Sequence, residues 1–166
     1  MGWYGSLGGG QSIKARAPGF LLVFFIYRRG NTGQKVQTRR WLNLRRRSNV
    51  RWVGSKPFSA LPGYLRLIDV GLTPYADTAF NRASFPLKTL EYLAAGRAVV
   101  ATPLPANDWL GTDLITVAAD PAAFAAEVAA RLGTPRSAEL VERRRAFARR
   151  HSWARRAETM ADLLKI

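Results

Sequence analysis

The sequence contains no cysteine and only one histidine, His151. Without thiols the chain can form neither disulfides nor thiolate metal sites, and one imidazole is too few for a conventional zinc site. We therefore expect no bound metal and no metal cofactor. Any catalysis must use other side chains.

Acidic residues are absent from residues 1–68, which hold 13 lysines and arginines. Residues 69–166 hold the other 13 basic residues and all 11 acids, so the net charge of +15 lies almost entirely in the first part. The chain has room for one well-packed domain of ordinary size. Its two parts differ sharply in composition.

Long apolar runs are also missing. The longest run, FLLVFFIY at residues 20–27, falls far short of the roughly 20 residues that cross a bilayer, and we interpret it as a buried strand. Arginines follow it and a small-residue cleavage site is lacking, which argues against a secretory signal. These features predict a soluble cytoplasmic protein.

The acid-free segment has three interpretations, of which the third is a shifted reading frame within residues 11–48. It could be a basic arm that neutralises the phosphates of nucleic acid or an anionic membrane surface, with Trp3, Tyr4 and Trp41 available for stacking on bases. It could equally be a solvated surface. No helix-turn-helix, zinc-finger or RNA-recognition signature is present, so nucleic acid is a disfavoured partner. Peripheral membrane association stays open.

Residues 49–166 alternate between apolar runs and helical patterns. Such alternation predicts an α/β fold, with a Rossmann-like parallel sheet covered by helices on both faces and a ligand crevice at the carboxyl ends of the strands. The elements expected are strands at 49–54, 68–75, 97–103 and 114–119, a helical connection at 57–67, loops at 76–84 and 107–113, and helices from 84 to about 95, 121–132, 136–150 and 152–165.

The helix that begins near residue 84 carries polar side chains on one stripe. At about 100° per residue, Ser84, Lys88 and Glu91 lie within about 60° of one another. We expect Leu87, Leu90 and Ala94 to pack on the sheet from the other side. Ser84 is the expected N-cap, Pro86 suits the first turn, and Gly96 suits the C-terminal end.

This stripe would stand at the crevice, beside the positive end of the helix dipole, which favours an anion. Lys88 could contact a diphosphate, and Glu91 could accept hydrogen bonds from vicinal hydroxyls such as those of a ribose. The alternative is that Lys88 and Glu91 form an exposed ion pair worth only a few tenths of a kcal/mol. Geometry alone leaves both interpretations open.

Several motifs in order carry a resemblance to a known family. The run PLKTLEYLAAGRAVVATPLP (86–105), preceded by IDVGLTPY (68–75) and NVRWVGSKPFSALPGYL (49–65), resembles the C-terminal, donor-binding domain of retaining GT-B glycosyltransferases of the family 1 or family 4 type. The closing HSWARRAETMADLL (151–164) is similar to the C-terminal helix of that branch. The resemblance covers about residues 49–166.

The resemblance implies a function in metal-independent, retaining glycosyl transfer, with a nucleotide-diphospho-sugar as the donor substrate and no cofactor. The nucleotide-sugar-binding residues that we expect are Asn81, Ser84, Phe85, Lys88 and Glu91, while the catalytic residues, the sugar and the acceptor stay unknown. Many relatives place a second glutamate, which contacts the sugar, eight residues before the one matching Glu91. Here that position is Ala83, and Asn81 or Ser84 would have to replace it.

Relatives of this kind use a second, N-terminal domain to bind the acceptor, and we expect that half to be missing or separate. In the expected division, residues 1–48 are a poorly matched basic segment that opens the donor domain, and residues 49–166 are the nucleotide-sugar-binding domain. Part of residues 11–48 could be translated in a shifted frame. The alternatives are a basic nucleic-acid-binding module or a non-catalytic remnant. By family analogy, the setting would be polysaccharide biosynthesis.

Overall fold

The computed structural model describes residue 50 and residues 56–165, and it divides the chain into two compact units, Met1–Ile68 and Asp69–Ile166. In the first unit the described part holds a 3-10 helix, η1 (Phe58–Ala60), followed by helix α2 (Leu61–Leu65). This confirms the helical connection expected at 57–67. The strands expected at 20–27 and 49–54 lie outside the described residues.

The second unit is built on a parallel sheet. Its strands β1 (Val70–Thr73), β2 (Ala98–Ala101) and β3 (Ile115–Val117) lie in the order β1-β2-β3. Val70 pairs with Ala98, and Val99 pairs with Ile115. All of β2 is buried, which is why its sequence is a continuous apolar run rather than an alternating one. The predicted α/β fold class is confirmed.

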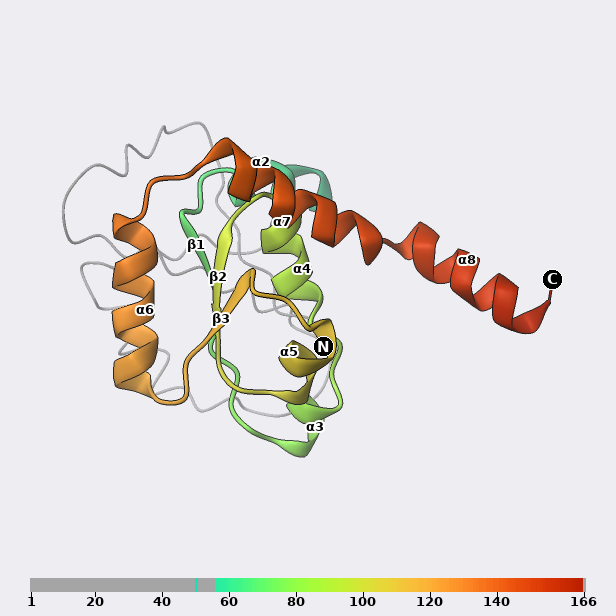
Figure 1. The fold of residues 1–166 in the computed structure, drawn as a ribbon, viewed down its shortest axis with the longest axis horizontal. Helices are drawn as coiled ribbons and strands as arrows, with labels where there is room; N and C mark the ends of the chain where they lie inside the picture. Colours follow the sequence, from blue (N-terminus) through green and yellow to red (C-terminus); the bar gives the residue numbers. More distant parts are fainter. Residues whose placement is uncertain (1–49, 51–55, 166) are drawn as a thin grey trace. The chain divides into compact units, whose positions relative to one another are not determined.

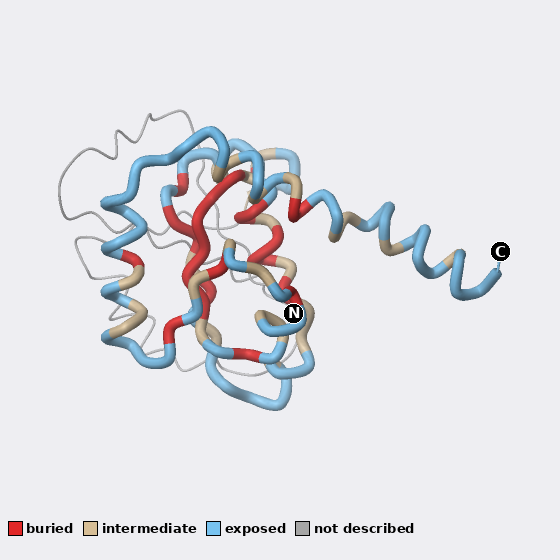
Figure 2. The backbone as a smooth tube through the Cα atoms, in the orientation of Figure 1, coloured by how far each residue is buried: buried red, intermediate tan, exposed pale blue. Residues whose placement is uncertain are grey.

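Helices cover both faces of this sheet, as Figure 1 shows: α6 lies on one face, and α4 lies on the other beside α7. Figure 2 shows that the buried residues concentrate on the strands and on α4. The helices of this unit are α3 (Ala79–Arg82), α4 (Leu87–Ala94), α5 (Pro105–Leu110), α6 (Pro121–Gly133), α7 (Ala138–Arg150) and α8 (Trp153–Leu164).

Local signals fix several helix ends. The Asp120 carboxylate caps α6 by accepting hydrogen bonds from the N–H groups of Ala122 and Ala123, both at 2.8 Å. At the end of α4, Gly96 has a φ of +75°. Its N–H donates to the Leu93 carbonyl at 2.8 Å and that of Arg97 to the Tyr92 carbonyl at 2.9 Å. These paired bonds satisfy the last carbonyls of the helix.

Two expected loops contain helical turns. Residues 107–113 were expected to be a loop, but α5 occupies Pro105–Leu110. Pro105 stands at the first turn, where its missing N–H costs nothing, and Gly111 ends the helix in a left-handed conformation with φ +54°. The loop expected at 76–84 likewise contains α3, whose N-cap Thr78 accepts a hydrogen bond from the Asn81 N–H.

The packing face of α4 also differs from the prediction. Leu90 is buried as expected, but Ala94 is exposed and Leu87 only partly covered, whereas Thr89, Tyr92 and Leu93 are buried. The reason is that α4 packs against β1 and β2 and also against α7. Two partners cover a much wider arc than a single stripe, and that arc includes Lys88.

Gly71 in β1 allows Tyr92 of α4 to approach the sheet. A Cβ added at Gly71 would lie 2.2 Å from Cγ of Tyr92, a distance that no real side chain tolerates. The absence of a side chain in the strand therefore makes room for a buried aromatic ring from the helix.

Within the described ranges, no helix is long and apolar enough to cross a membrane.

Candidate functional site

The candidate site lies at the carboxyl edge of the sheet, where the segments after β1 and β2 are joined by hydrogen bonds. The Thr102 hydroxyl donates to the Tyr75 carbonyl at 2.7 Å, and the Asn107 side-chain amide donates to the Thr102 carbonyl at 2.8 Å. Helix α4 begins at this same edge, because it follows β1 and runs back to the start of parallel β2. The strand ends and the amino end of α4 thus form one side of the unit.

Lys88 and Glu91 form an ion pair one turn apart on α4. The Lys88 side chain is only 7% exposed, whereas that of Glu91 is 28% exposed. Burial lowers the pKa of Lys88, and the neighbouring Glu91 carboxylate partly offsets that effect. The pair is therefore more buried than the surface pair considered from the sequence, and the carboxylate is the more accessible partner.

Two tyrosines lie near this pair. Burial raises the pKa of Tyr75 to about 12, and the negative charge of Glu91 adds to the rise. Burial also raises the pKa of Tyr92, with Tyr75 and Glu91 contributing. Both phenols are neutral at physiological pH, so Glu91 provides the negative charge in this neighbourhood.

Ser84 does not cap α4, contrary to the prediction. The N-cap position belongs to Pro86, and the Ser84 hydroxyl donates to the Phe80 carbonyl at 2.7 Å. The physical reason is that the short helix α3 ends at Arg82, and Ser84 bonds back to it across the turn. The polar stripe on α4 is therefore reduced to Lys88 and Glu91.

Asn81 lies on α3, in the segment that leads to α4. Its side-chain amide donates to the Ala76 carbonyl at 2.8 Å. Arg82 and Asp77 form a bidentate ion pair across the same turn, with both N–O distances 2.6 Å, and this pair stabilises the turn. Asn81 thus has a defined position close in sequence to Ala83.

Phe85 belongs to a cluster of aromatic side chains that the sequence did not predict. Its ring meets Trp109 edge to face with 5.5 Å between centroids, and the Arg156 guanidinium stacks over it at 3.8 Å. Trp109 also meets His151, which packs 4.7 Å from Phe147. No sequence signal unites these residues, because they come from α5, α7, α8 and the turn before α4.

His151 lies at the junction between α7 and α8. It is the C-cap of α7 and is partly covered by its aromatic neighbours. Burial lowers the pKa of His151, and the positive charges of Arg156 and Arg150 lower it further. His151 is therefore neutral at pH 7. Over the residues that the structure describes, no three histidine, aspartate or glutamate side chains gather as a metal site would require.

Comparison with known proteins defines the class of protein. The family model of glycosyl transferases group 1 matches residues 12–133, and the chain belongs to this family. The match starts upstream of residues 49–166, on which the resemblance rests, and ends before α7 and α8. The parallel sheet with helices on both faces is consistent with the Rossmann-like C-terminal half of a retaining GT-B enzyme.

A curated relative is similar over a shorter stretch. It is the putative teichuronic acid biosynthesis glycosyltransferase TuaH of Bacillus subtilis (strain 168), 47% identical over 64 residues. That match covers 39% of this chain and 16% of the relative. No solved structure matched the chain significantly.

Proposed function

We propose that the second unit binds a nucleotide-diphospho-sugar and serves as the donor half of a metal-independent, retaining glycosyltransferase. The observation that carries the proposal is the Lys88–Glu91 pair on α4 at the carboxyl edge of the sheet, where parallel sheets bind their ligands. Membership of the glycosyl transferases group 1 supports it.

In this proposal each charged residue has a distinct role. The amino end of α4 carries the positive end of the helix dipole, and Lys88 adds a positive charge, so together they attract the diphosphate. Glu91, the more accessible partner, accepts hydrogen bonds from the ribose hydroxyls. Fixed positive groups at the leaving diphosphate would stabilise the charge that develops as the glycosidic bond breaks.

Asn81, Ser84 and Phe85 complete the proposed site. Asn81 and Ser84 contact the sugar, in place of the glutamate that the family resemblance leads one to expect at position 83. Phe85, held by Trp109 and Arg156, forms the apolar edge of the site. A further domain would bind the acceptor. The reaction would take place in the cytoplasm. The name of the curated relative, which gives a role in teichuronic acid biosynthesis, supports a role in polysaccharide biosynthesis.

A binding titration tests the proposal. The full chain is titrated with UDP-, GDP- and ADP-sugars at about 0.15 M salt, as wild type and as Glu91→Ala. We expect the wild type to bind the sugar of one nucleotide saturably. Glu91→Ala should bind it at least about tenfold more weakly, because a charge-assisted hydrogen bond is lost. Equal affinity of wild type and Glu91→Ala would refute the role of Glu91.

Two further variants separate binding from folding. Glu91→Ala removes the carboxylate that pairs with the buried Lys88, which should lower the free energy of unfolding by about 1 to 3 kcal/mol. Lys88→Met combined with Glu91→Ala removes the buried charge, so this double variant should regain stability and still bind weakly. Glu142→Ala removes an exposed carboxylate paired with Arg149 and should bind as wild type.

The salt dependence of binding tests the nucleic-acid alternative. Affinity for a nucleotide-sugar should change little between about 50 and 200 mM salt, whereas binding through many phosphate contacts falls by about 10³ to 10⁵ over that range. Tight, strongly salt-dependent binding of oligonucleotides, with none of nucleotide-sugars, would favour the basic module instead.

A further inference from the structure

A small cavity lies at the opposite, amino edge of the sheet. Asp69, just before β1, and Ala98, the first residue of β2, form part of its wall. The ends of α4 and α6 and the beginning of α7 complete it, and its volume is about 60 Å³. This edge is one strand length, about 13 Å for four residues, from the proposed donor site.

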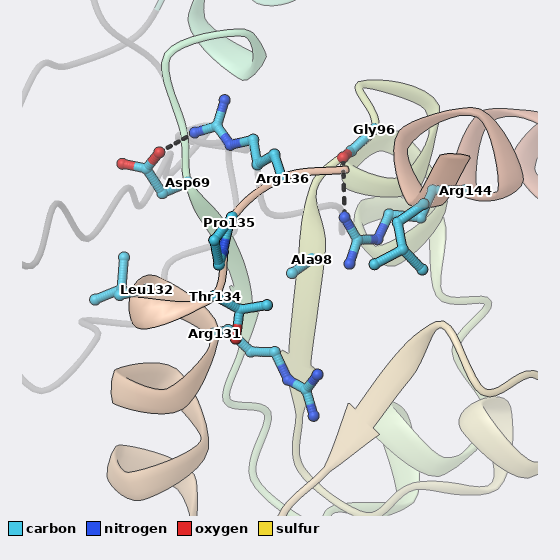
Figure 3. A pocket seen from close by; sticks show the side chains of 10 residues that line it. Asp69, Gly96, Ala98, Arg131, Leu132, Thr134, Pro135, Arg136 and Arg144 are labelled. Atoms are coloured by element: carbon cyan, nitrogen blue, oxygen red, sulfur yellow. Dashed lines mark hydrogen bonds and ion pairs between the residues drawn. The ribbon is translucent and has the colours of Figure 1, made fainter. Parts of the chain in front are cut away.

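Three arginines from separate segments line this cavity: Arg131 near the end of α6, Arg136 in the following turn and Arg144 on α7. Figure 3 shows them around Ala98. Two more arginines, Arg97 and Arg143, lie close enough to repel Arg144 electrostatically. Positive charge converges here from four parts of the chain.

Carboxylates balance this charge only in part. Arg136 pairs with Asp69, and Arg143 pairs with Asp113 at 2.8 Å. Arg131 lies 3.5 Å from Glu127, with both side chains about 40% exposed, which makes a weak surface pair. Within the part of the chain that the structure describes, these three carboxylates offset only part of the positive charge around the cavity.

Arg144 has the least complete set of partners. Its terminal nitrogen Nη1 donates to the Gly96 carbonyl at 3.4 Å, a long bond. Its Nε is buried and, among the described residues, has no hydrogen-bond partner. Burial lowers the pKa of Arg144, and the surrounding arginines lower it further. A buried donor of this kind is costly to leave unsatisfied.

We propose that this cavity is a second anion site, which binds a phosphate group between Arg131, Arg136 and Arg144. A phosphate oxygen would accept from the buried Nε of Arg144, and the planar forks of the other arginines match the geometry of an oxyanion. The bound anion would also relieve the repulsion among the guanidinium groups. The phosphate can belong to a soluble ion or to a lipid headgroup.

The first test is a titration of the full chain with inorganic phosphate at about 0.15 M salt. Arg131→Gln removes an exposed arginine of the cavity, so the fold should tolerate it, and its thermal melt verifies this. Arg149→Gln is the matched control, because Arg149 lies on α7, outside the cavity, in a surface pair with Glu142. We expect affinity to fall about tenfold in Arg131→Gln and to stay at the wild-type value in Arg149→Gln.

The second arm of the test identifies the source of the phosphate. Cosedimentation with vesicles of phosphatidylcholine, with and without phosphatidic acid, is compared for the same variants. Binding to phosphatidic acid that Arg131→Gln weakens and Arg149→Gln does not would assign the site to a lipid headgroup. Binding of inorganic phosphate alone, with the same dependence, would assign it to a soluble ion.

The proposal fails if neither probe binds, or if both variants weaken binding equally, since that would reflect net charge alone. Arg144→Lys provides an independent measurement, because it keeps the charge but loses Nε. It should weaken phosphate binding as well, and wild-type affinity in a folded Arg144→Lys protein would overturn the role assigned to Nε. In a Glu91→Ala background, Arg131→Gln should still weaken phosphate binding relative to Arg149→Gln by the same factor. The test is therefore independent of the donor site.

Discussion

Lys88 illustrates how burial changes the meaning of a residue pair. In sequence it is one lysine three residues before one glutamate, a spacing that is common on solvent-exposed helices. In the structure its side chain is almost fully covered and the carboxylate of Glu91 offsets part of the cost. A buried pair of this kind adds little net stability, which is consistent with a role in binding.

Tyr75 provides a test of the same neighbourhood through pH. Its pKa rises from 10.0 to about 12 on folding. Below pH 10 both folded and unfolded chains keep the proton, and between pH 10 and 12 the unfolded chain loses it first. Stability should therefore fall as pH rises through this window.

The measurement is urea unfolding at steps from pH 9 to pH 11.5, for wild type and for Tyr75→Phe. The variant should lose less stability across that range, because it has no phenol to ionise at this position. Tyr92, whose pKa is also raised, should leave part of the decline in place. An identical decline of stability with pH in the two proteins would show that folding does not raise the pKa of Tyr75.

The sequence predicted which charged side chains lie together on α4 better than it predicted what packs around them. The angular positions on a helix place Lys88 and Glu91 together, and the structure pairs them. Helical periodicity carries no information on α7, which covers a second flank of α4. Nor does the sequence show that Ser84 bonds back to Phe80, since that bond depends on the short helix α3.

At the scale of elements, β1 and α4 fit together because one position carries no side chain. Gly71→Ala would place a methyl group inside the Tyr92 ring. The ring has no free space in a closely packed core, so the strand or the helix would have to shift. We expect the free energy of unfolding to drop by about 3 kcal/mol.

Chemical denaturation measures this effect, and Gly63→Ala is its control. Among the described residues, no atom lies within 4 Å of a Cβ built at Gly63 in α2, and alanine is the better helix former by about 1 kcal/mol. That variant should be unchanged or slightly more stable. A Gly71→Ala protein as stable as wild type would contradict the packing of α4 on β1 described here.

Which elements could be predicted depends on how strong their local signals are. Apolar runs identify β1, β2 and β3. The signal is strongest for β2, which is buried throughout, because a strand buried on both faces needs apolar residues at every position. Asp120 and Pro121 identify the start of α6 through N-capping. The six-residue helix α5 was missed because it is too short for a periodic pattern, and only Pro105 and Gly111 mark its ends.

In the molecule as a whole, the two sites that we propose lie at opposite edges of one sheet. The carboxyl edge holds the Lys88–Glu91 pair, and the amino edge holds the arginines around Arg144. The family match also includes much of the basic N-terminal half, residues 12–68. The domain boundary expected between residues 48 and 49 stays a prediction. So does the shifted reading frame within residues 11–48.

The aromatic cluster at Phe85 shows what only the assembled molecule can reveal. Trp109, His151 and Arg156 lie 24, 66 and 71 residues after Phe85 in the chain, yet they form one continuous group with it. Local patterns cannot predict such a group, because its members share no periodicity. It joins the end of α7 and the beginning of α8 to the turn that leads into α4.

The most direct test of the central claim is hydrogen–deuterium exchange of the full chain, with and without the nucleotide-sugar that binds best. We expect slower exchange at the amino end of α4, residues 87–91, and at the strand ends near Tyr75 and Thr102. Residues 131–136 at the amino edge should be unaffected. Slower exchange confined to residues 1–48, or to the amino edge, would contradict the assignment of the donor site to the carboxyl edge.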